Sequence, residues 1–269
     1  MGNRLEGKIA AVTGSSSGNG RAIALALARE GATVVCSDIR KSALQGGYEE
    51  DIEKDTDDVI RDEGGRAEYL DCDTTKASDV QALVERAVSA FGRLDIMVNN
   101  AGVFTGLHTI VDETEEQYDF TMAVNAKGVW LGCKYAIAQM LKQEDTSEGE
   151  TSRGKIINIA SIGGLVGLAA EPAYCASKGA VVNLTRQLAV DYAPERININ
   201  AICPGFLATA MVRPFLDDPE LNKTLHELSP WPHLGTAEDV GKLALYLASD
   251  DAEMVTGSMQ VLDGGYTAG

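Results

Sequence analysis

The sequence has little of what a membrane protein or a nucleic-acid-binding protein needs. No stretch approaches the roughly eighteen consecutive apolar residues of a membrane-spanning helix, and residues 1–7 are too polar for a signal peptide. The 23 basic residues are outnumbered by 40 acidic ones, which gives a net charge of −17. Because nucleic acids and anionic membranes bind basic surfaces, we expect a soluble, cytoplasmic protein that binds neither.

Cysteine and histidine are also scarce. The cysteines are odd in number and lack C-x-x-C spacing, which indicates reduced thiols that fill the core rather than a disulfide framework. They are Cys36, Cys72, Cys133, Cys175 and Cys203. The three histidines, His108, His226 and His233, show no metal-ligand spacing. The sequence therefore predicts no metal site.

The chain does contain a regular alternation of apolar runs and helical segments. Its 269 residues, 45% of them hydrophobic, are enough for one large α/β core. The runs are almost continuously apolar, which is typical of parallel strands covered on both faces. They lie at 8–13, 33–37, 66–71, 95–98, 155–160, 197–202 and 258–262. Gly64-Gly65 predicts a helix end before the third run, and Ala77-Ser78-Asp79 predicts a helix start after it.

A glycine-rich turn follows the first predicted strand. Residues 13–20 read TGSSSGNG and lead into a helical segment. Glycines allow a tight turn and close approach of the backbone, and the unpaired amides at the start of the helix suit a pyrophosphate. The next strand ends in Asp38, about twenty residues past the glycines, where a carboxylate accepts ribose hydroxyl groups. This order of elements indicates a dinucleotide site.

A second group of residues indicates a catalytic site. Tyr174 and Lys178 lie one helical turn apart, and Ser161 ends the apolar run 156–160. A phenol has an ordinary pKa of about 10, but a cation on the same helix face stabilises the phenolate, so Tyr174 can exchange a proton with an alcohol. The Ser161 hydroxyl is placed to orient the reacting oxygen. Tyr-x-x-x-Lys alone is common on surfaces, but beside a dinucleotide site it indicates hydride transfer.

Together these motifs resemble the short-chain dehydrogenase/reductase family over nearly the whole chain. Residues 13–20 match its TGxxxGxG motif, 99–102 its NNAG motif, and Tyr174 with Lys178 its YxxxK motif. Asn19 replaces the usual isoleucine, at a position where only backbone contact with the cofactor is expected. The resemblance implies an α/β fold: a single doubly wound Rossmann-type domain, spanning 1–269, with a seven-stranded, mostly parallel sheet and helices on both faces.

The resemblance also implies the site residues. The catalytic ones are Asn125, Ser161, Tyr174 and Lys178. Tyr174 is the acid and base, Lys178 lowers its pKa and binds the nicotinamide ribose, and Ser161 holds the substrate oxygen. Asn125 anchors a water that links Lys178 to solvent. The cofactor-binding residues are Gly14, Ser17, Gly18, Asn19, Gly20, Asp38, Ile39, Cys72, Asp73, Asn100, Ala101, Gly102, Tyr174, Lys178, Pro204, Gly205, Leu207 and Thr209.

The implied reaction is the NAD-dependent interconversion of a secondary alcohol and a ketone. Asp38 favours NAD, because the 2′-phosphate of NADP would meet its carboxylate; Ile39 offers no basic replacement, and the Arg40 side chain is expected to face away. One alternative is a 3-oxoacyl-carrier-protein reductase that uses NADPH, against which Asp38 and the acidic charge count. Another is a non-catalytic nicotinamide-binding regulator, which would be expected to lack the active-site Tyr or Lys.

Four further expectations concern the substrate, the loops and the assembly. A substrate loop at about 205–235 carries Phe206, Met211, Phe215, Leu216 and Trp231, which predicts a small to medium, partly apolar alcohol or ketone as the partner molecule. Segments 41–58 and 143–154 are predicted to be surface loops, with a binding role as the alternative. Trp130 is predicted to pack in the core, with a subunit interface as the alternative. The resemblance implies a homotetramer.

Overall fold

The computed structural model describes residues 4–49, 51–144 and 152–269. All seven predicted strands are present, with ends that differ from the predicted ones by at most two residues. They are β1 (Ile9–Thr13), β2 (Thr33–Asp38), β3 (Arg66–Asp71), β4 (Ile96–Asn99), β5 (Gly154–Ile159), β6 (Ile197–Pro204) and β9 (Met259–Leu262). The almost unbroken apolar runs form strands that are buried on both faces in the middle of the sheet.

The strands form one parallel sheet in the order β3-β2-β1-β4-β5-β6-β9. The chain first builds outward from β1 to β3 and then returns to the other side of β1 with β4. At this reversal the connections after β1 and β4 leave in opposite directions and open a crevice at the carboxyl ends of the strands, where ligands bind in sheets of this kind. The Rossmann-type prediction is therefore confirmed, with a sheet that is parallel throughout.

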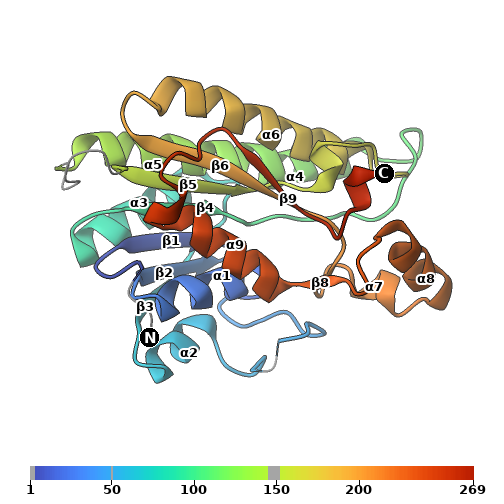
Figure 1. Cartoon of the computed structure of the whole chain (residues 1–269), viewed down its shortest axis with the longest axis horizontal. Helices are drawn as coiled ribbons and strands as arrows, with labels where there is room; N and C mark the ends of the chain where they lie inside the picture. The colour runs from blue at the N-terminus through green and yellow to red at the C-terminus, as the bar shows by residue number, and fades with distance from the viewer. Residues whose placement is uncertain (1–3, 50, 145–151) are drawn as a thin grey trace.

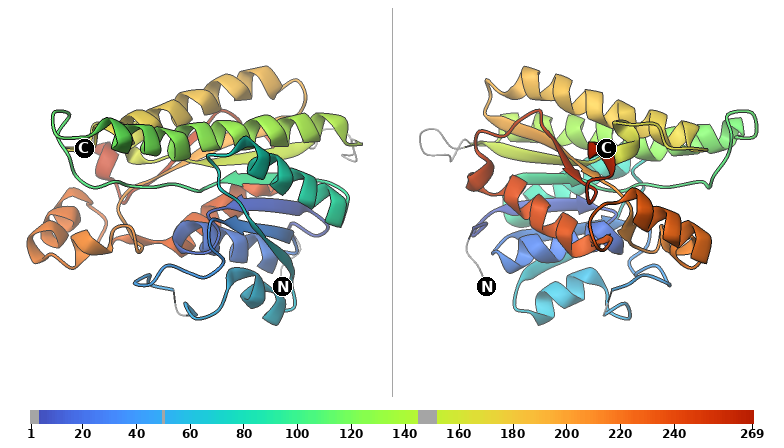
Figure 2. Two further views of the ribbon diagram at one scale, coloured as in Figure 1. Left: turned by 180° about the vertical axis from the view of Figure 1, so that it is seen from behind. Right: turned by 45° about the vertical axis from the view of Figure 1, so that its right-hand side comes forward.

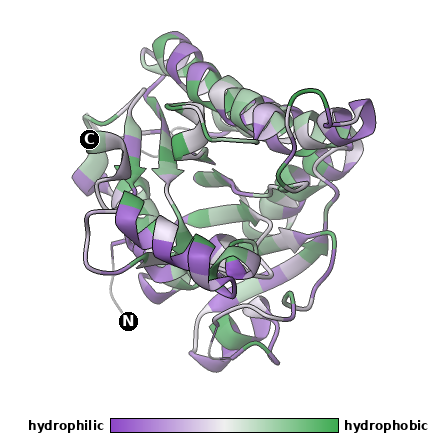
Figure 3. Ribbon diagram, turned by 90° about the vertical axis from the view of Figure 1, so that its right-hand side faces the viewer, coloured by the Kyte–Doolittle hydropathy of each residue, from purple (hydrophilic) through white to green (hydrophobic). Residues whose placement is uncertain are grey.

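Helices cover both faces of the sheet (Figures 1 and 2). One layer contains α3 (Ala77–Phe91), α4 (Glu115–Met122), α5 (Val129–Lys142) and α6 (Pro172–Tyr192). The other contains α1 (Gly18–Arg29), α2 (Thr56–Asp62) and α9 (Ala237–Ala248). Each layer buries its own apolar cluster against the sheet. Figure 3 shows much hydrophobic colour on the strands, whereas the helices carry hydrophobic and hydrophilic residues in alternation.

The predicted substrate loop has structure of its own. It contains the short parallel pair β7 (Leu207–Ala208) and β8 (Gly235–Thr236), and between them α7 (Arg213–Leu216) and α8 (Pro219–Leu228). Figure 1 shows α7 and α8 projecting beyond the sheet at its carboxyl edge. Short 3₁₀ turns complete the chain at Ile162–Gly164, Asp250–Ala252 and Tyr266–Ala268. Within the described ranges, no helix combines the length and apolar character needed to cross a bilayer.

The helix boundaries follow the signals in the sequence. Helix α3 begins at Ala77 as predicted. Gly64, after the end of α2, has a φ of +85°, a left-handed conformation that glycine adopts without strain. Segment 41–58 is a loop that leads into α2, as expected, whereas the middle of segment 143–154 lies outside the described residues.

Trp130 is not in the core. Its side chain is 46% exposed on α5, and the Lys134 ammonium lies 5.1 Å from the centre of its ring. The buried face of α5 is formed instead by smaller side chains such as Leu131, Ala136 and Met140. The core prediction was therefore wrong, because composition does not reveal which face of a largely apolar helix points inward.

Candidate active site

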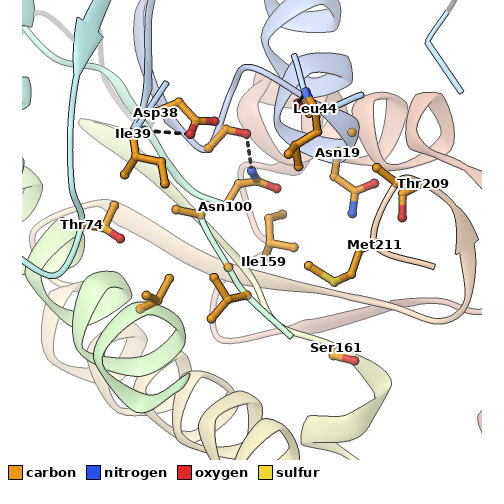
Figure 4. Close-up of a pocket in the computed structure, with 18 of the residues that line it drawn as sticks. Asn19, Asp38, Ile39, Leu44, Thr74, Asn100, Ile159, Ser161, Thr209 and Met211 are labelled. Atoms are coloured by element: carbon orange, nitrogen blue, oxygen red, sulfur yellow. Dashed lines mark hydrogen bonds between the residues drawn. The ribbon is translucent and has the colours of Figure 1, made fainter. Parts of the chain in front are cut away.

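A cavity of about 590 Å³ opens at the carboxyl ends of the strands. It extends from Asp38, after β2, to Ser161, Tyr174 and Lys178 on the other side of the reversal point. Figure 4 shows Asp38 and Ser161 toward opposite ends of the labelled residues. All predicted catalytic and cofactor-binding residues line this cavity except Gly20 and Asn125.

Gly20 does not line the cavity but packs against the glycine turn that does. A Cβ atom on Gly20 would lie 2.0 Å from the Gly14 carbonyl oxygen, so only glycine allows the first turn of α1 to pack on residue 14. Gly14 itself has a φ of +65°, and its Cβ would lie 2.9 Å from the Ala101 Cα atom. The glycine turn and the loop after β4 are thus in direct backbone contact, which brings two motifs far apart in the sequence together.

Asn100 connects the same two loops. Its side-chain amide donates to the carbonyl oxygens of Thr13 and Gly14, at 2.9 and 3.0 Å. The Thr13 hydroxyl accepts in return from the backbone amides of Asn100 and Ala101, at 3.0 and 3.1 Å. Asn100 therefore fixes the shape of the glycine turn; its neighbour Asn99 is buried and donates to Asn158 on β5.

Asp38 is held at the end of β2. Its carboxylate accepts from the backbone amides of Ser16 and Ile39, at 3.2 and 2.7 Å, and Figure 4 shows the bond to Ile39. Both oxygens are fixed at the rim of the cavity, with Ile39 65% exposed beside them. Arg40, which the sequence analysis expected to face away, is among the residues that line the cavity.

Cys72 and Asp73 line the same end of the cavity after β3. The Cys72 amide donates to the Asp38 carbonyl oxygen at 2.8 Å, which ties the two strand ends together. The Asp73 carboxylate accepts from the backbone amide and hydroxyl of Thr75 and pairs with Lys76. The pKa of Asp73 lies below its ordinary value, chiefly because the Thr75 hydroxyl donates a hydrogen bond to its carboxylate and also because Lys76 is nearby.

Asn125 lies in a π-helical turn, Ala123–Gly128, between α4 and α5. Its side-chain amide is fully buried and forms three hydrogen bonds: it accepts from the Val103 amide, donates to the Val103 carbonyl, and donates to Ser177 on α6. The wider turn is a common feature of functional sites. Here it lets Asn125 join the loop after β4 to the helix that carries Tyr174 and Lys178.

Ser161, Tyr174 and Lys178 meet at the end of β5. The Ser161 hydroxyl accepts from the Gly163 amide at 3.1 Å and hydrogen bonds with the Tyr174 phenol. Lys178 is 4% exposed, and its Nζ atom donates to the Ile159 carbonyl oxygen at 3.0 Å and lies 5.7 Å from the centre of the Tyr174 ring. The structure thus brings together the three side chains that the sequence predicted to act together.

Burial controls the protonation of this group. Burial raises the pKa of Tyr174 to about 12. The hydrogen bond with Ser161 lowers this pKa, and the nearby Glu171 carboxylate raises it further. Burial also lowers the pKa of Lys178 to about 8. Lys178 is not among the groups that shift the pKa of Tyr174 here, and its Nζ atom donates to the Ile159 carbonyl oxygen; that Lys178 lowers this pKa stays a prediction. Both pKa values move toward the neutral form of the side chain.

Aromatic side chains pack around the Tyr174 ring. Phe104, in the loop after β4, meets it edge-on with ring centres 5.7 Å apart. Phe104 also contacts Phe215 of α7, with centres 6.0 Å apart. Phe206 packs instead on Tyr266, and the 61% exposed Trp231 donates to His233, so neither lines the cavity.

Sequence reasoning missed several lining residues. They come mainly from segments next to known motifs: Leu44, Thr74, Thr75, Val103, Phe120, Ala123, Val124, Ile159, Ala160, Ala210 and Val212. Thr74, Thr75 and Val103 follow the motif residues Asp73 and Gly102 directly, so the motifs could have predicted them. Leu44 and Phe120 had no local signal, since their loops or helices approach the cavity only in three dimensions.

Acidic side chains gather at one other place in the described residues. Oxygen atoms of Asp55, Asp57 and Asp58 lie within 4.8 Å of one another. The Lys41 ammonium lies 3.3 Å from carboxylate oxygens of both Asp55 and Asp57 and 3.7 Å from Asp58. Lys41 and Arg61, which also pairs with Asp57 and Asp58, therefore offset most of the negative charge of this cluster.

Comparison with known proteins agrees with the fold. Residues 14–267 match the family described as enoyl-(acyl carrier protein) reductase. The chain is 38% identical over 263 residues to 2-(R)-hydroxypropyl-CoM dehydrogenase of Xanthobacter autotrophicus, an alignment that covers 97% of this chain and 99% of that protein. It is 37% identical over 265 residues to cyclopentanol dehydrogenase of Comamonas testosteroni, covering 98% and 99%.

A solved structure is similar along the whole chain. It is an Agrobacterium tumefaciens protein with bound NADP, 33% identical, which superposes with a TM-score of 0.85 over 98% of each chain. The chain belongs to the short-chain dehydrogenase/reductase family, as its motifs predicted. It is thus an oxidoreductase that acts on a CH–OH group with a nicotinamide cofactor.

Proposed function

We propose that this protein is an NAD-dependent dehydrogenase that interconverts a secondary alcohol and its ketone. One observation carries the proposal: a single cavity has the Asp38 carboxylate at one end and Ser161, Tyr174 and Lys178 at the other. The first group suits the adenosine ribose of a dinucleotide, and the second suits proton exchange with an alcohol. Residues 1–269 form one catalytic domain in this proposal, with the substrate loop at about 205–235.

The residues present fit such a cofactor. Gly14 and Gly20 have no room for a Cβ atom against the protein's own atoms, which fixes the tight turn whose residues Gly14, Ser17, Gly18 and Asn19 line the cavity. The Asn19 side-chain oxygen is buried without a hydrogen-bond partner in the described structure, as expected of a polar atom beside a ligand site. Asp38, with both oxygens fixed, would accept the two ribose hydroxyls and disfavour a 2′-phosphate. Lys178 would donate to the nicotinamide ribose.

The chain's own part in the reaction is proton transfer and orientation. A nicotinamide dinucleotide held by these residues would supply the hydride acceptor for oxidation of the carbinol carbon and the hydride donor for reduction of the ketone. Tyr174, with a pKa near 12, carries its proton at neutral pH and is therefore ready to donate it to a ketone oxygen. In oxidation it takes the hydroxyl proton as phenolate, so that direction should speed up as pH rises. Ser161 holds the reacting oxygen in both directions.

The surroundings of Tyr174 favour an apolar substrate. Phe104 covers one side of its ring, and Val103, Phe120 and Met211 line the cavity. One relative is described as cyclopentanol dehydrogenase, and cyclopentanol is an alcohol with an apolar ring that would suit such a site. We therefore propose small to medium secondary alcohols with an apolar body, and no nucleic acid or membrane partner.

Two observations favour a rival cofactor. A similar structure holds NADP, and Arg40 lines the cavity beside Asp38. An NADPH-dependent 3-oxoacyl-carrier-protein reductase is accordingly the second candidate. The net charge of −17 counts against it, because an acidic carrier protein would be repelled. A non-catalytic regulator is the least supported, since Tyr174 and Lys178 are both present.

We further propose a cytoplasmic homotetramer. The five cysteines are free. Large apolar side chains are exposed on the layer formed by α4, α5 and α6, where a partner would cover them: Tyr118, Trp130 and Val190. The edge strand β9 presents the half-exposed Val261. Light scattering at micromolar concentration should give four times the mass of the chain, and a monomer mass would contradict the assembly.

The test of function is a turnover assay with purified protein. A panel of secondary alcohols that includes cyclopentanol, cyclohexanol and 2-butanol is mixed with NAD or NADP, and reduced nicotinamide is followed by its absorbance. We expect turnover of at least one alicyclic alcohol with NAD. Turnover of a 3-oxoacyl thioester with NADPH, without alcohol oxidation, would favour the second candidate.

A further inference from the structure

The loop after β2 crosses the glycine turn. We call residues 43–49 the strap. Its Leu44 amide donates to the Ser17 hydroxyl at 2.7 Å, and Leu44 lines the cavity. Figure 4 shows Leu44 on the same side of the cavity as Asn19. At the other end of the strap, the Glu49 carboxylate accepts from the Gly18 amide at 2.5 Å. The strap thus bonds to two neighbouring residues of the turn.

The Gly18 amide lies at the N-terminus of a helix. Gly18 is the first residue of α1, whose leading amides have no partner within the helix and carry the positive end of its dipole. This is the position where helices bind phosphate groups. The Glu49 carboxylate, an anion of this chain, takes the place that a cofactor phosphate would use.

Glu49 is held there by only one of its two oxygens. Its Oε2 atom is buried without a hydrogen-bond partner in the described structure. A buried oxygen of this kind costs free energy, because it has lost water and gained nothing in return. A ligand that offers the helix start a better-placed anion can therefore displace the carboxylate.

The strap also reaches the substrate loop. The Gly46 carbonyl oxygen accepts from Arg213 at 2.9 Å, and the Arg213 guanidinium lies 5.6 Å from the centre of the Tyr48 ring. Arg213 begins α7, and Phe215 of the same turn packs on Phe104. One continuous set of contacts therefore leads from Gly18 to the side chain that covers Tyr174.

We propose that Glu49 is an internal competitor of the cofactor: it occupies the phosphate position at Gly18 and leaves when the dinucleotide binds. The inference rests on the proposed function, because it assumes that a nicotinamide dinucleotide fills the cavity. Binding exchanges the Gly18–Glu49 hydrogen bond for a Gly18–phosphate bond and frees the Glu49 end of the strap, whose Gly46 carbonyl accepts from Arg213 of the substrate loop. Cofactor affinity is therefore set partly by a residue that never touches the bound cofactor.

The test compares full-length variants by titration of NADH fluorescence. Glu49→Ala removes the competitor and should lower the NADH dissociation constant roughly tenfold, the factor expected for a charge-assisted hydrogen bond of about 1.4 kcal/mol. Glu49→Gln keeps a weaker, neutral acceptor and should fall between Glu49→Ala and the unmodified protein. Glu53→Ala, at an exposed position of the same loop, removes the same charge without the contact and should bind like the unmodified protein.

The direction in which Glu49→Ala changes the NADH dissociation constant distinguishes a competitor from a residue that only supports the loop. A residue that only supports the loop would weaken NADH binding when removed, so a higher dissociation constant in Glu49→Ala overturns the proposal. Equal gains in Glu49→Ala and Glu53→Ala would also overturn it, because they would reduce the effect to net charge. If the unmodified protein, Glu53→Ala and Glu49→Ala all fail to bind NADH, the proposed function itself is wrong and the competitor falls with it.

Discussion

Lys178 should make the protein less stable than it would be with an apolar side chain at that position. The ammonium is buried with one hydrogen bond, to Ile159, and burial lowers its pKa from the ordinary 10.5 to about 8. In the unfolded chain the group keeps its proton up to its ordinary pKa. One pKa unit equals about 1.4 kcal/mol, so at pH 7 the protonated lysine costs about 3 kcal/mol of folding free energy.

Replacing this residue tests both the size and the sign of that cost. Lys178→Met removes the charge but leaves the Ile159 carbonyl without its donor, which costs about 2 kcal/mol. The net expectation at pH 7 is a variant more stable by about 1 kcal/mol. Between pH 8 and 10.5 the unfolded chain binds a proton that the folded protein does not, so the stability of the unmodified protein rises with pH relative to the variant. By pH 10 the variant should be the less stable of the two.

Urea unfolding at pH 7, 8, 9 and 10, at one protein concentration and without cofactor, measures this crossing. Lys223→Met, at an exposed lysine that pairs with Glu227, is the control and should show no pH-dependent difference from the unmodified protein. A Lys178→Met variant that is less stable at pH 7, by an amount that stays constant to pH 10, would show that burial does not lower the pKa of Lys178. The side chain would then be protonated alike in both states.

Three further predictions concern the reaction. Tyr174→Phe should keep its fold and NADH binding but lose about 10²–10⁴-fold in kcat, and near-normal kcat in a folded variant would reject the acid–base role. Ser161→Ala should lower kcat by more than it raises the NADH dissociation constant, because its hydroxyl meets the substrate; equal effects would count against this. NAD should be preferred over NADP by at least about tenfold in kcat/KM, and Asp38→Ala with Ile39→Arg should narrow or reverse that preference. Equal kcat/KM values in the unmodified protein would contradict the role of Asp38.

The fold was accessible from the sequence because its signals are local. Each buried parallel strand is one continuous apolar run, and the glycine turn, Asp38 and the Tyr174–Lys178 pair are each confined to a few residues. The order of these segments along the chain was enough to place them at one edge of the sheet.

What sequence reasoning missed depends on three-dimensional surroundings. The pKa of Tyr174 is set by burial, which spacing along a helix cannot show. The bond between Glu49 and Gly18 joins residues 31 positions apart in a loop without periodicity. The π-helical turn at Asn125 and the exposed position of Trp130 follow from how α4 and α5 pack, not from their composition.

In the proposed function, a hydride moves from the carbinol carbon of a secondary alcohol to a nicotinamide. The most direct measurement uses an alcohol from the panel that carries deuterium on that carbon, with NAD and a single turnover, followed by mass spectrometry of the reduced cofactor. We expect the reduced nicotinamide to gain one deuterium, and the Tyr174→Phe variant to form little of this labelled product. Product ketone with no deuterium in the cofactor, or label released to water, would contradict the account.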